Sequence, residues 1–112
     1  MNILYRSNKL EKQCKNYKDA QKAFNKDVAE KLHSVINFIE NADNLMDVKC
    51  IPSFNLHPLF GDRQGTYAID LGRRSGFRLI VIPLDNDQKC WTISDVNEIY
   101  KSTSIIVAVE VT

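Results

Sequence analysis

Apolar residues in the first half of the chain recur at the spacing of an α-helix. Between residues 19 and 41 they occur every three or four positions, with lysines and acids between them; the apolar positions are Ala23, Phe24, Val28, Leu32, Val35, Ile36 and Ile39. This period predicts one long amphipathic helix that ends near residues 41–44. His33 lies on this helix without a second metal-ligand residue at helical spacing, so we interpret it as a surface or boundary residue.

Shorter elements are predicted on either side of this helix. Residues 2–5 are mainly apolar and compatible with a strand, at the edge or in the centre of a sheet. Residues 8–16 begin with an asparagine followed three positions later by a glutamate, the spacing of a capping box, which predicts a short helix. A further turn is expected over residues 43–48, and it must end before Pro52, because the residue before a proline avoids the helical region.

The second half of the chain has the period of β-strands. Strands are predicted over residues 66–71, 77–82, 90–93 and 103–111, with turns at residues 72–76 and 85–87. Residues 96–101 fit either a strand or a loop. Because short turns join antiparallel neighbours, the whole pattern predicts an α+β fold, in which an N-terminal helical hairpin packs on one face of a small, mainly antiparallel sheet.

Length and composition narrow the class of protein. With 112 residues, 44% of them hydrophobic, the chain is expected to form a single domain over residues 1–112. Its longest apolar runs are far shorter than the ~20 residues of a membrane span, and its first residues lack the apolar core of an export signal. Three widely spaced cysteines are typical of reduced thiols. We therefore expect a cytoplasmic protein that does not contact a membrane.

Positive charge is concentrated in the middle of the chain, although the net charge of the whole chain is only +1. Residues 49–78 contain two acids and five cations, and the cations are Lys49, Arg63, Arg73, Arg74 and Arg78. Most of these are arginines, whose planar guanidinium groups bind phosphate with two parallel hydrogen bonds. This segment is therefore the candidate anion-binding surface, and the alternative is a solvated rim of the sheet.

The usual catalytic motifs are absent from the sequence. Residues 61–65 have the glycines of a phosphate-binding loop but neither its lysine nor its strand-to-helix context. No serine lies in a nucleophile elbow, and the two histidines and three cysteines lack the spacing of a zinc site. The sequence therefore predicts no metal site and no cofactor.

The most specific feature is the loop that leads into the first strand of the second half. Residues 56–69 read LHPLFGDRQGTYAI, and residues 76–80 read GFRLI. This sequence resembles the HigB-type toxins of the RelE/ParE superfamily, whose pattern is HPL-x-GDR-x-G-x-[WY]-[AS]-I, followed by a hairpin and an [FW]-R-[LI] strand. The helical hairpin predicted before the loop also fits, so the resemblance extends over nearly the whole chain.

The resemblance implies a RelE-like fold and a toxin of a type II toxin–antitoxin module. Toxins of this kind are held inactive by an antitoxin with a helix-turn-helix domain, and operator DNA is contacted only through that antitoxin. Most of them are ribosome-dependent endoribonucleases, also called mRNA interferases, which cut mRNA in the ribosomal A site and so arrest translation and growth. The expected partners of this chain are therefore an antitoxin, the ribosome and mRNA.

The motif and the chemistry of RNA cleavage together indicate the candidate site residues. Cleavage needs an activated 2′-hydroxyl, a stabilised phosphorane and a protonated leaving oxygen. His57 is the candidate acid–base group because imidazole titrates near neutral pH, and Arg63 and Arg78 are the candidates for holding the scissile phosphate. The candidate RNA-binding residues are Lys49, Tyr67, Arg73 and Arg74, the tyrosine as a stacking surface and the others as backbone contacts.

Structural roles are the alternatives for these residues. His57 precedes a proline and could bond the backbone of a tight loop. Arg63 could pair with Asp62 or Asp70, and Tyr67 could belong to the core instead of contacting a base. These readings stay open at the level of the sequence.

One departure from the family pattern concerns the end of the chain. HigB-type toxins usually carry a short tail with His and Tyr after the last strand, and this tail contributes to catalysis, whereas the sequence here stops at residues 109–112 (VEVT). The alternatives to an endoribonuclease are therefore a catalytically weak or inactive member that binds RNA or the antitoxin, and a gyrase inhibitor like the ParE branch.

Overall fold

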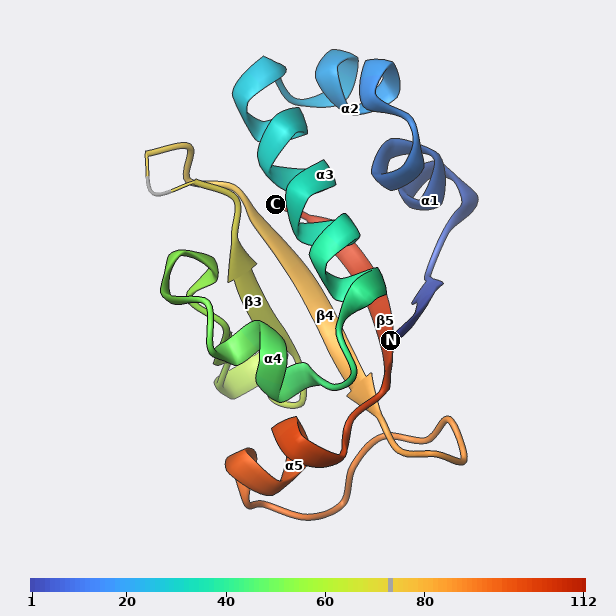
Figure 1. Cartoon of the computed structure of the whole chain (residues 1–112), viewed down its shortest axis with the longest axis vertical. Helices are drawn as coiled ribbons and strands as arrows, with labels where there is room; N and C mark the ends of the chain where they lie inside the picture. Colours follow the sequence, from blue (N-terminus) through green and yellow to red (C-terminus); the bar gives the residue numbers. More distant parts are fainter. Residues whose placement is uncertain (73) are drawn as a thin grey trace.

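Helices lead and strands follow along most of the chain, after one initial strand (Figure 1). A computed structural model describes residues 1–72 and 74–112. The strands in this part are β1 (Asn2–Tyr5), β2 (His57–Pro58), β3 (Tyr67–Asp70), β4 (Arg78–Leu84) and β5 (Ile105–Val111). The helices are α1 (Asn8–Lys15), α2 (Tyr17–Ala23), α3 (Lys26–Asn41), α4 (Leu45–Lys49) and α5 (Val96–Ser102), with short 3₁₀ turns η1 (Pro52–Phe54) and η2 (Gly61–Arg63). The predicted mixed α+β class is confirmed.

The five strands of the described chain form one mixed sheet with the order β1-β5-β4-β3-β2. The strands β2 to β5 pair antiparallel with their neighbours, whereas β1 is parallel to β5. The sequence left the position of residues 2–5 in the sheet open, and the pairing puts them at an edge, where the blue β1 lies beside the red β5 in Figure 1. The predicted fold began with an N-terminal helical hairpin. The structure instead begins with a strand, because β1 precedes every helix.

The single long helix predicted from residue 19 onwards is wrong, because the structure has two helices, α2 and α3, in its place. The break lies at Phe24 and Asn25, where Oδ1 of Asn25 accepts a hydrogen bond from the amide of Val28 at 2.9 Å. This bond satisfies one of the free amides at the start of α3 and so favours a new helix start. Both helices bury an apolar face in the same core, so the apolar period continues across the break and does not reveal it.

Residues 90–102 also differ from what the sequence predicts. A strand was expected over residues 90–93, but in the described chain only Cys90 makes a bridge, to Leu84 of β4. Residues 96–101, which fit a strand or a loop, form α5. Asp95 starts this helix because its Oδ1 accepts hydrogen bonds at 3.0 and 3.3 Å from the amides two and three positions later.

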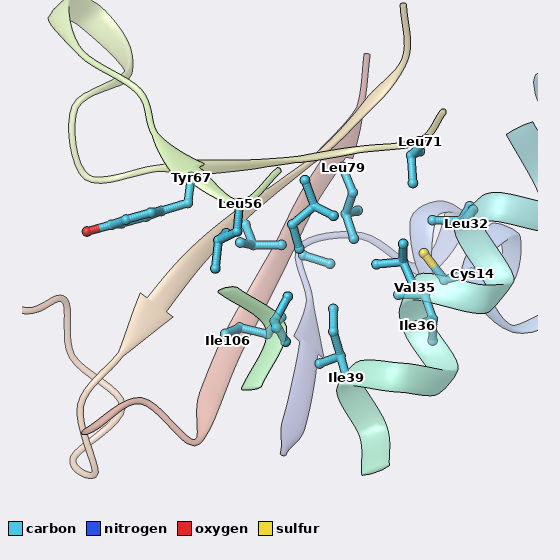
Figure 2. Close-up of a cluster of buried hydrophobic side chains, with 14 of the residues drawn as sticks. Cys14, Leu32, Val35, Ile36, Ile39, Leu56, Tyr67, Leu71, Leu79 and Ile106 are labelled. Carbon is cyan, nitrogen blue, oxygen red and sulfur yellow. The ribbon is translucent and has the colours of Figure 1, made fainter. Parts of the chain in front are cut away.

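The two faces of the sheet have different surroundings. On one face, alternate strand residues pack with α1, α2, α3 and α4 in a continuous apolar core; these strand residues are Tyr67, Ile69, Leu79, Val81, Ile106 and Ala108. Figure 2 shows Leu32, Val35 and Ile39 of α3 between that helix and the sheet. Side chains alternate along a strand, so the residues between these point the other way. We call the sheet face that they form the open face.

The three cysteines differ in their burial. Cys14 is buried in the core beside α3, whereas Cys50 and Cys90 are exposed, and all three are free thiols in the described chain. Within the described residues, every helix is too short or too polar to cross a membrane.

Candidate functional site

Four strands contribute one row of side chains to the open face. The register pairs that form the row are His57 with Ala68, Ala68 with Ile80, and Ile80 with Glu110. Direct partners across antiparallel strands lie on the same face, and strands ~4.8 Å apart separate the two ends of the row by ~14 Å. Ala68 and Ile80 are fully buried. The row is therefore an apolar floor between an imidazole and a carboxylate.

His57 is held by the backbone of its own loop. Its Nδ1 lies 2.6 Å from the carbonyl oxygen of Asn55, and because a carbonyl oxygen only accepts, we assign the proton to Nδ1. In the neutral ring, Nε2 then has a lone pair that can take a proton from a substrate. Asn55 is itself held, because its Nδ2 donates to Oδ2 of Asp70 at 3.0 Å. The backbone bond considered as the structural alternative for His57 is therefore present, and it leaves the second ring nitrogen available for chemistry.

Arg63 reaches the open face from the loop before β3. The loop turns at two glycines with positive φ, and Thr66 closes it by donating from its amide and its hydroxyl to the Arg63 carbonyl at 3.0 and 2.7 Å. One guanidinium nitrogen of Arg63, Nη2, lies 2.6 Å from Oε1 of Glu110 on β5. Among the described residues, the ionic partner of Arg63 is thus Glu110 and neither Asp62 nor Asp70.

The ion pair between Arg63 and Glu110 is accessible to solvent. The two side chains are 46% and 41% exposed. An exposed pair of this kind contributes only about 0–1 kcal/mol, because water screens both charges. A phosphate offers the same guanidinium a bidentate partner. Phosphate can therefore replace the carboxylate at little energetic cost.

Arg78 lies on the open face one step along the sheet from this row. It is the direct partner of Asp70 on β3, and its amide and carbonyl exchange hydrogen bonds with Thr112 at 2.8 and 3.0 Å. It is two residues from Ile80 on β4, a separation of ~7 Å on the same face. Within the described part of the chain, Arg78 forms no ion pair. The open face therefore carries all three candidate catalytic residues, His57, Arg63 and Arg78.

Lys49 and Tyr67 lie on the helical side of the sheet, apart from these three residues. Tyr67 is 5% exposed and packs edge-on against Tyr100, with 5.7 Å between the ring centres, and burial raises the pKa of its phenol. Nζ of Lys49 donates to the carbonyl of Leu56 at 3.0 Å and lies 6.0 Å from the centre of the Tyr100 ring. These contacts join α4 and α5 to the start of β3. In this arrangement the Tyr67 ring has almost no surface on which a base could stack.

The remaining two predicted RNA-binding residues, Arg73 and Arg74, follow β3 in the sequence. Arg74 is exposed in a turn, near the end of β4 that carries Arg78. Arg73 lies outside the described residues. A contact between Arg74 and an RNA backbone is sterically open and stays a prediction.

Two features of this region were not anticipated from the sequence. Glu110 is the single acid in the apolar run of residues 105–111, and this was the available signal that it has a polar partner. A groove with a volume of about 520 Å³ lies between the loop before β3 and the segment that precedes α5. Phe60, which is 77% exposed, lines it together with Leu59, and these two adjacent bulky apolar residues in the loop were the available signal for this groove.

Known proteins offer no assignment for the site. No model of a known protein family matches the chain, and no curated protein matches it either. Function is therefore inferred from the motif of residues 56–69, from residues 76–80, and from the geometry of the open face.

Proposed function

We propose that this chain is a HigB-type toxin with a RelE-like fold, acting as a ribosome-dependent mRNA endoribonuclease that arrests translation. The observation that carries the proposal is that His57, Arg63 and Arg78 all lie on the open face of the sheet. These residues are separated in the motif but share one surface. The helices α1 to α4 pack on the opposite face, so they do not cover this surface.

The chemistry of the site suits cleavage by the RNA's own 2′-hydroxyl. The 2′-oxygen forms a bond to phosphorus, the bond from phosphorus to the 5′-oxygen breaks, and a 2′,3′-cyclic phosphate and a 5′-hydroxyl result. Nε2 of His57 takes the proton of the 2′-hydroxyl. The guanidinium groups of Arg63 and Arg78 donate to the non-bridging oxygens and stabilise the charge of the phosphorane. The leaving 5′-oxygen takes its proton from water.

The expected inhibitor is an antitoxin with a helix-turn-helix domain. The toxin–antitoxin complex would contact operator DNA only through this antitoxin. It would act by covering the open face or by keeping the toxin out of the ribosomal A site. Buried guanidinium groups need partners, so an antitoxin that covers Arg63 and Arg78 is expected to bring acidic or aromatic groups to them.

A second candidate function is binding of RNA or the antitoxin without cleavage. The observation that favours it is the pairing of Arg63 with Glu110, which neutralises one of the two candidate phosphate-binding groups before any substrate arrives. Under this alternative, substitution of His57 leaves binding and growth inhibition unchanged, because no proton is transferred.

The test is induced expression with primer extension on a reporter mRNA, in one version with its start codon and in one without it. We expect growth arrest and cuts only in the translated version. His57→Ala, Arg63→Ala and Arg78→Ala should each lower the cleavage rate by ~10²–10³, the usual effect of losing one group that stabilises the transition state.

The matched control is Lys18→Ala, which removes an exposed cation from α2, away from the open face. It should cleave like the parent chain. Intact mRNA in arrested cells would contradict the nuclease and favour the binding function or a gyrase inhibitor. Equal cleavage by all three open-face variants would mean that the site is elsewhere.

A further inference from the structure

The groove lined by Phe60 lies next to the row of side chains that runs from His57 to Glu110. Leu59 and Thr66 both line the groove and are joined by a hydrogen bond of 2.9 Å from the Leu59 amide to the Thr66 carbonyl. Leu59 is two residues beyond His57, and Thr66 is two residues before Ala68, so the groove is one step, ~7 Å, along the sheet from the row. The loop that carries Arg63 forms one wall of this groove.

The lining of the groove is mainly apolar, with aliphatic and aromatic side chains and a few uncharged polar groups. None of the described residues that line it carries a formal charge. Its aromatic side chains at the surface are Phe60 and Trp91, and its amide and hydroxyl groups come from Gln64, Thr66, Thr92 and Ser94. The volume of about 520 Å³ is in the range of small-molecule sites. This combination fits a flat neutral group with hydrogen-bonding edges better than a charged one.

Trp91 is fixed in place before any ligand binds. Its Nε1 donates to Oγ1 of Thr103 at 2.9 Å, and that hydroxyl donates to the carbonyl of Ile99 at 2.6 Å. Thr103 is fully buried, so this chain of bonds ties the indole to α5 and to the start of β5. A ring held in this way loses little freedom when it contacts a ligand.

We propose that this groove binds a nucleobase of single-stranded RNA, next to the phosphate that Arg63 holds, with Phe60 and Trp91 as its stacking surfaces. This inference rests on the proposed function, because it takes the same RNA. Bases in single strands are recognised by stacking on aromatic side chains and by hydrogen bonds to their edges. Phe60 and Arg63 are three positions apart in one loop, so base and phosphate contacts would lie side by side.

The experiment uses the emission of Trp91, the only tryptophan in the chain. The probe is a trinucleotide of adenosines with 2′-O-methyl riboses, which cannot be cleaved because it has no free 2′-hydroxyl. We expect saturable quenching of Trp91 by the trinucleotide and none by inorganic phosphate at the same ionic strength. Phe60→Ala should weaken the binding by roughly 5- to 100-fold, the range for loss of one base–aromatic stack.

The matched control is Leu4→Ala, which removes exposed apolar surface from β1 outside the groove. It should bind like the parent chain, and circular dichroism should show both variants folded. Quenching by N-acetyl-leucinamide but not by the trinucleotide would overturn the proposal and make the groove a protein-docking site. Quenching by the trinucleotide without mRNA cleavage in cells would support base binding in the groove and contradict the proposed nuclease function. Cleavage without quenching would support the nuclease function and contradict base binding in the groove.

Discussion

At the scale of single residues, the open face is organised by a contact between distant positions. Arg63 and Glu110 are 47 residues apart in the sequence, yet their side chains meet at 2.6 Å. The carboxylate pairs with the guanidinium over the sheet. Under the proposed function, Glu110 competes with phosphate for the same arginine.

Glu110→Gln tests this competition. The variant keeps the size of the side chain but removes its charge, so we expect a labelled single-stranded oligoribonucleotide to bind up to about fivefold more tightly, in keeping with the small energy of an exposed ion pair. Fluorescence anisotropy at low salt measures it, and the gain should shrink at high salt. Glu30→Gln, on an exposed position of α3, is the control. Weaker binding by Glu110→Gln would show that the carboxylate positions Arg63 for phosphate.

The cysteines allow a prediction of thiol reactivity. Burial raises the pKa of Cys14 from 9.0 to about 12, whereas Cys50 and Cys90 are exposed. We expect a disulfide reagent at pH 8 to modify two thiols rapidly in the folded protein and the third only after denaturation. Rapid reaction of all three would mean that the contact of α1 with the core opens readily.

The raised pKa of Cys14 also predicts how stability changes with pH. The folded chain keeps the thiol proton between pH 9 and pH 12, whereas the unfolded chain releases it. The unfolded state therefore binds fewer protons in this range, and the free energy of unfolding must fall as the pH rises from 9 to 12. Cys14→Ala should show a smaller fall than the parent chain when urea unfolding is followed across this range.

At the scale of elements, a capping asparagine separates two helices although the apolar pattern continues from one to the other. The residues of α2 and α3 bury one face in the same core, but α2 has its C-cap at Phe24 and Asn25 caps the start of α3. The turn changes the direction of the chain, so that α1 and α2 lie beside the upper end of α3 in Figure 1. Local capping thus decides where the helical layer bends.

Asn25→Ala should destabilise the fold by about 1 kcal/mol, because the amide of Val28 loses its hydrogen bond. The midpoint of urea unfolding measures the effect. Asn37→Ala, at an exposed position within α3, is the control and should cause no loss. An unchanged midpoint for Asn25→Ala would indicate that α2 and α3 join into one helix in the variant.

At the scale of the whole molecule, the apolar core and the candidate site lie on opposite faces of one sheet. The helices α1 to α4 and the apolar core lie on one face, and the three candidate catalytic residues lie on the other. Under the proposed function, substituting these three residues changes binding and catalysis and leaves the core on the other face intact. Lys49 and Tyr67, which lie on the helical side, are expected to affect stability more than RNA contact.

Hydrogen exchange should reflect this arrangement. The amides of Leu79, Ile80 and Val81 lie on a strand paired on both sides and buried, so we expect them to exchange slowest. Residues 86–95 are mostly exposed and largely outside regular pairing, and we expect them to exchange fastest. Exchange followed by mass spectrometry measures both. Fast exchange in β4 would contradict the strand order described above.

The amino-acid sequence alone determined the mixed fold class and most of its elements. A period near 3.6 or 2 directly records which face of a helix or strand is buried, so α3, β3, β4 and β5 lie within segments that spacing predicted. The short helix α1 was predicted from a capping pattern at Asn8, and its N-cap in the structure is the preceding residue, Ser7. The motif likewise marked His57, Arg63 and Arg78 as candidates, and their catalytic role stays a prediction. The period could not reveal the break at Asn25, because both helices use the same core, nor the start of α5, which depends on one capping acid.

Only the tertiary structure decided which of these residues share a surface. Local sequence says which face of an element is apolar, but the neighbours across the sheet depend on the order of the strands. That order brings Glu110 to Arg63 across 47 residues and assigns Tyr67 to the core although it follows the motif loop directly. It also brings Trp91 and Phe60 into the lining of one groove. These contacts join positions far apart in the chain, and no local pattern encodes them.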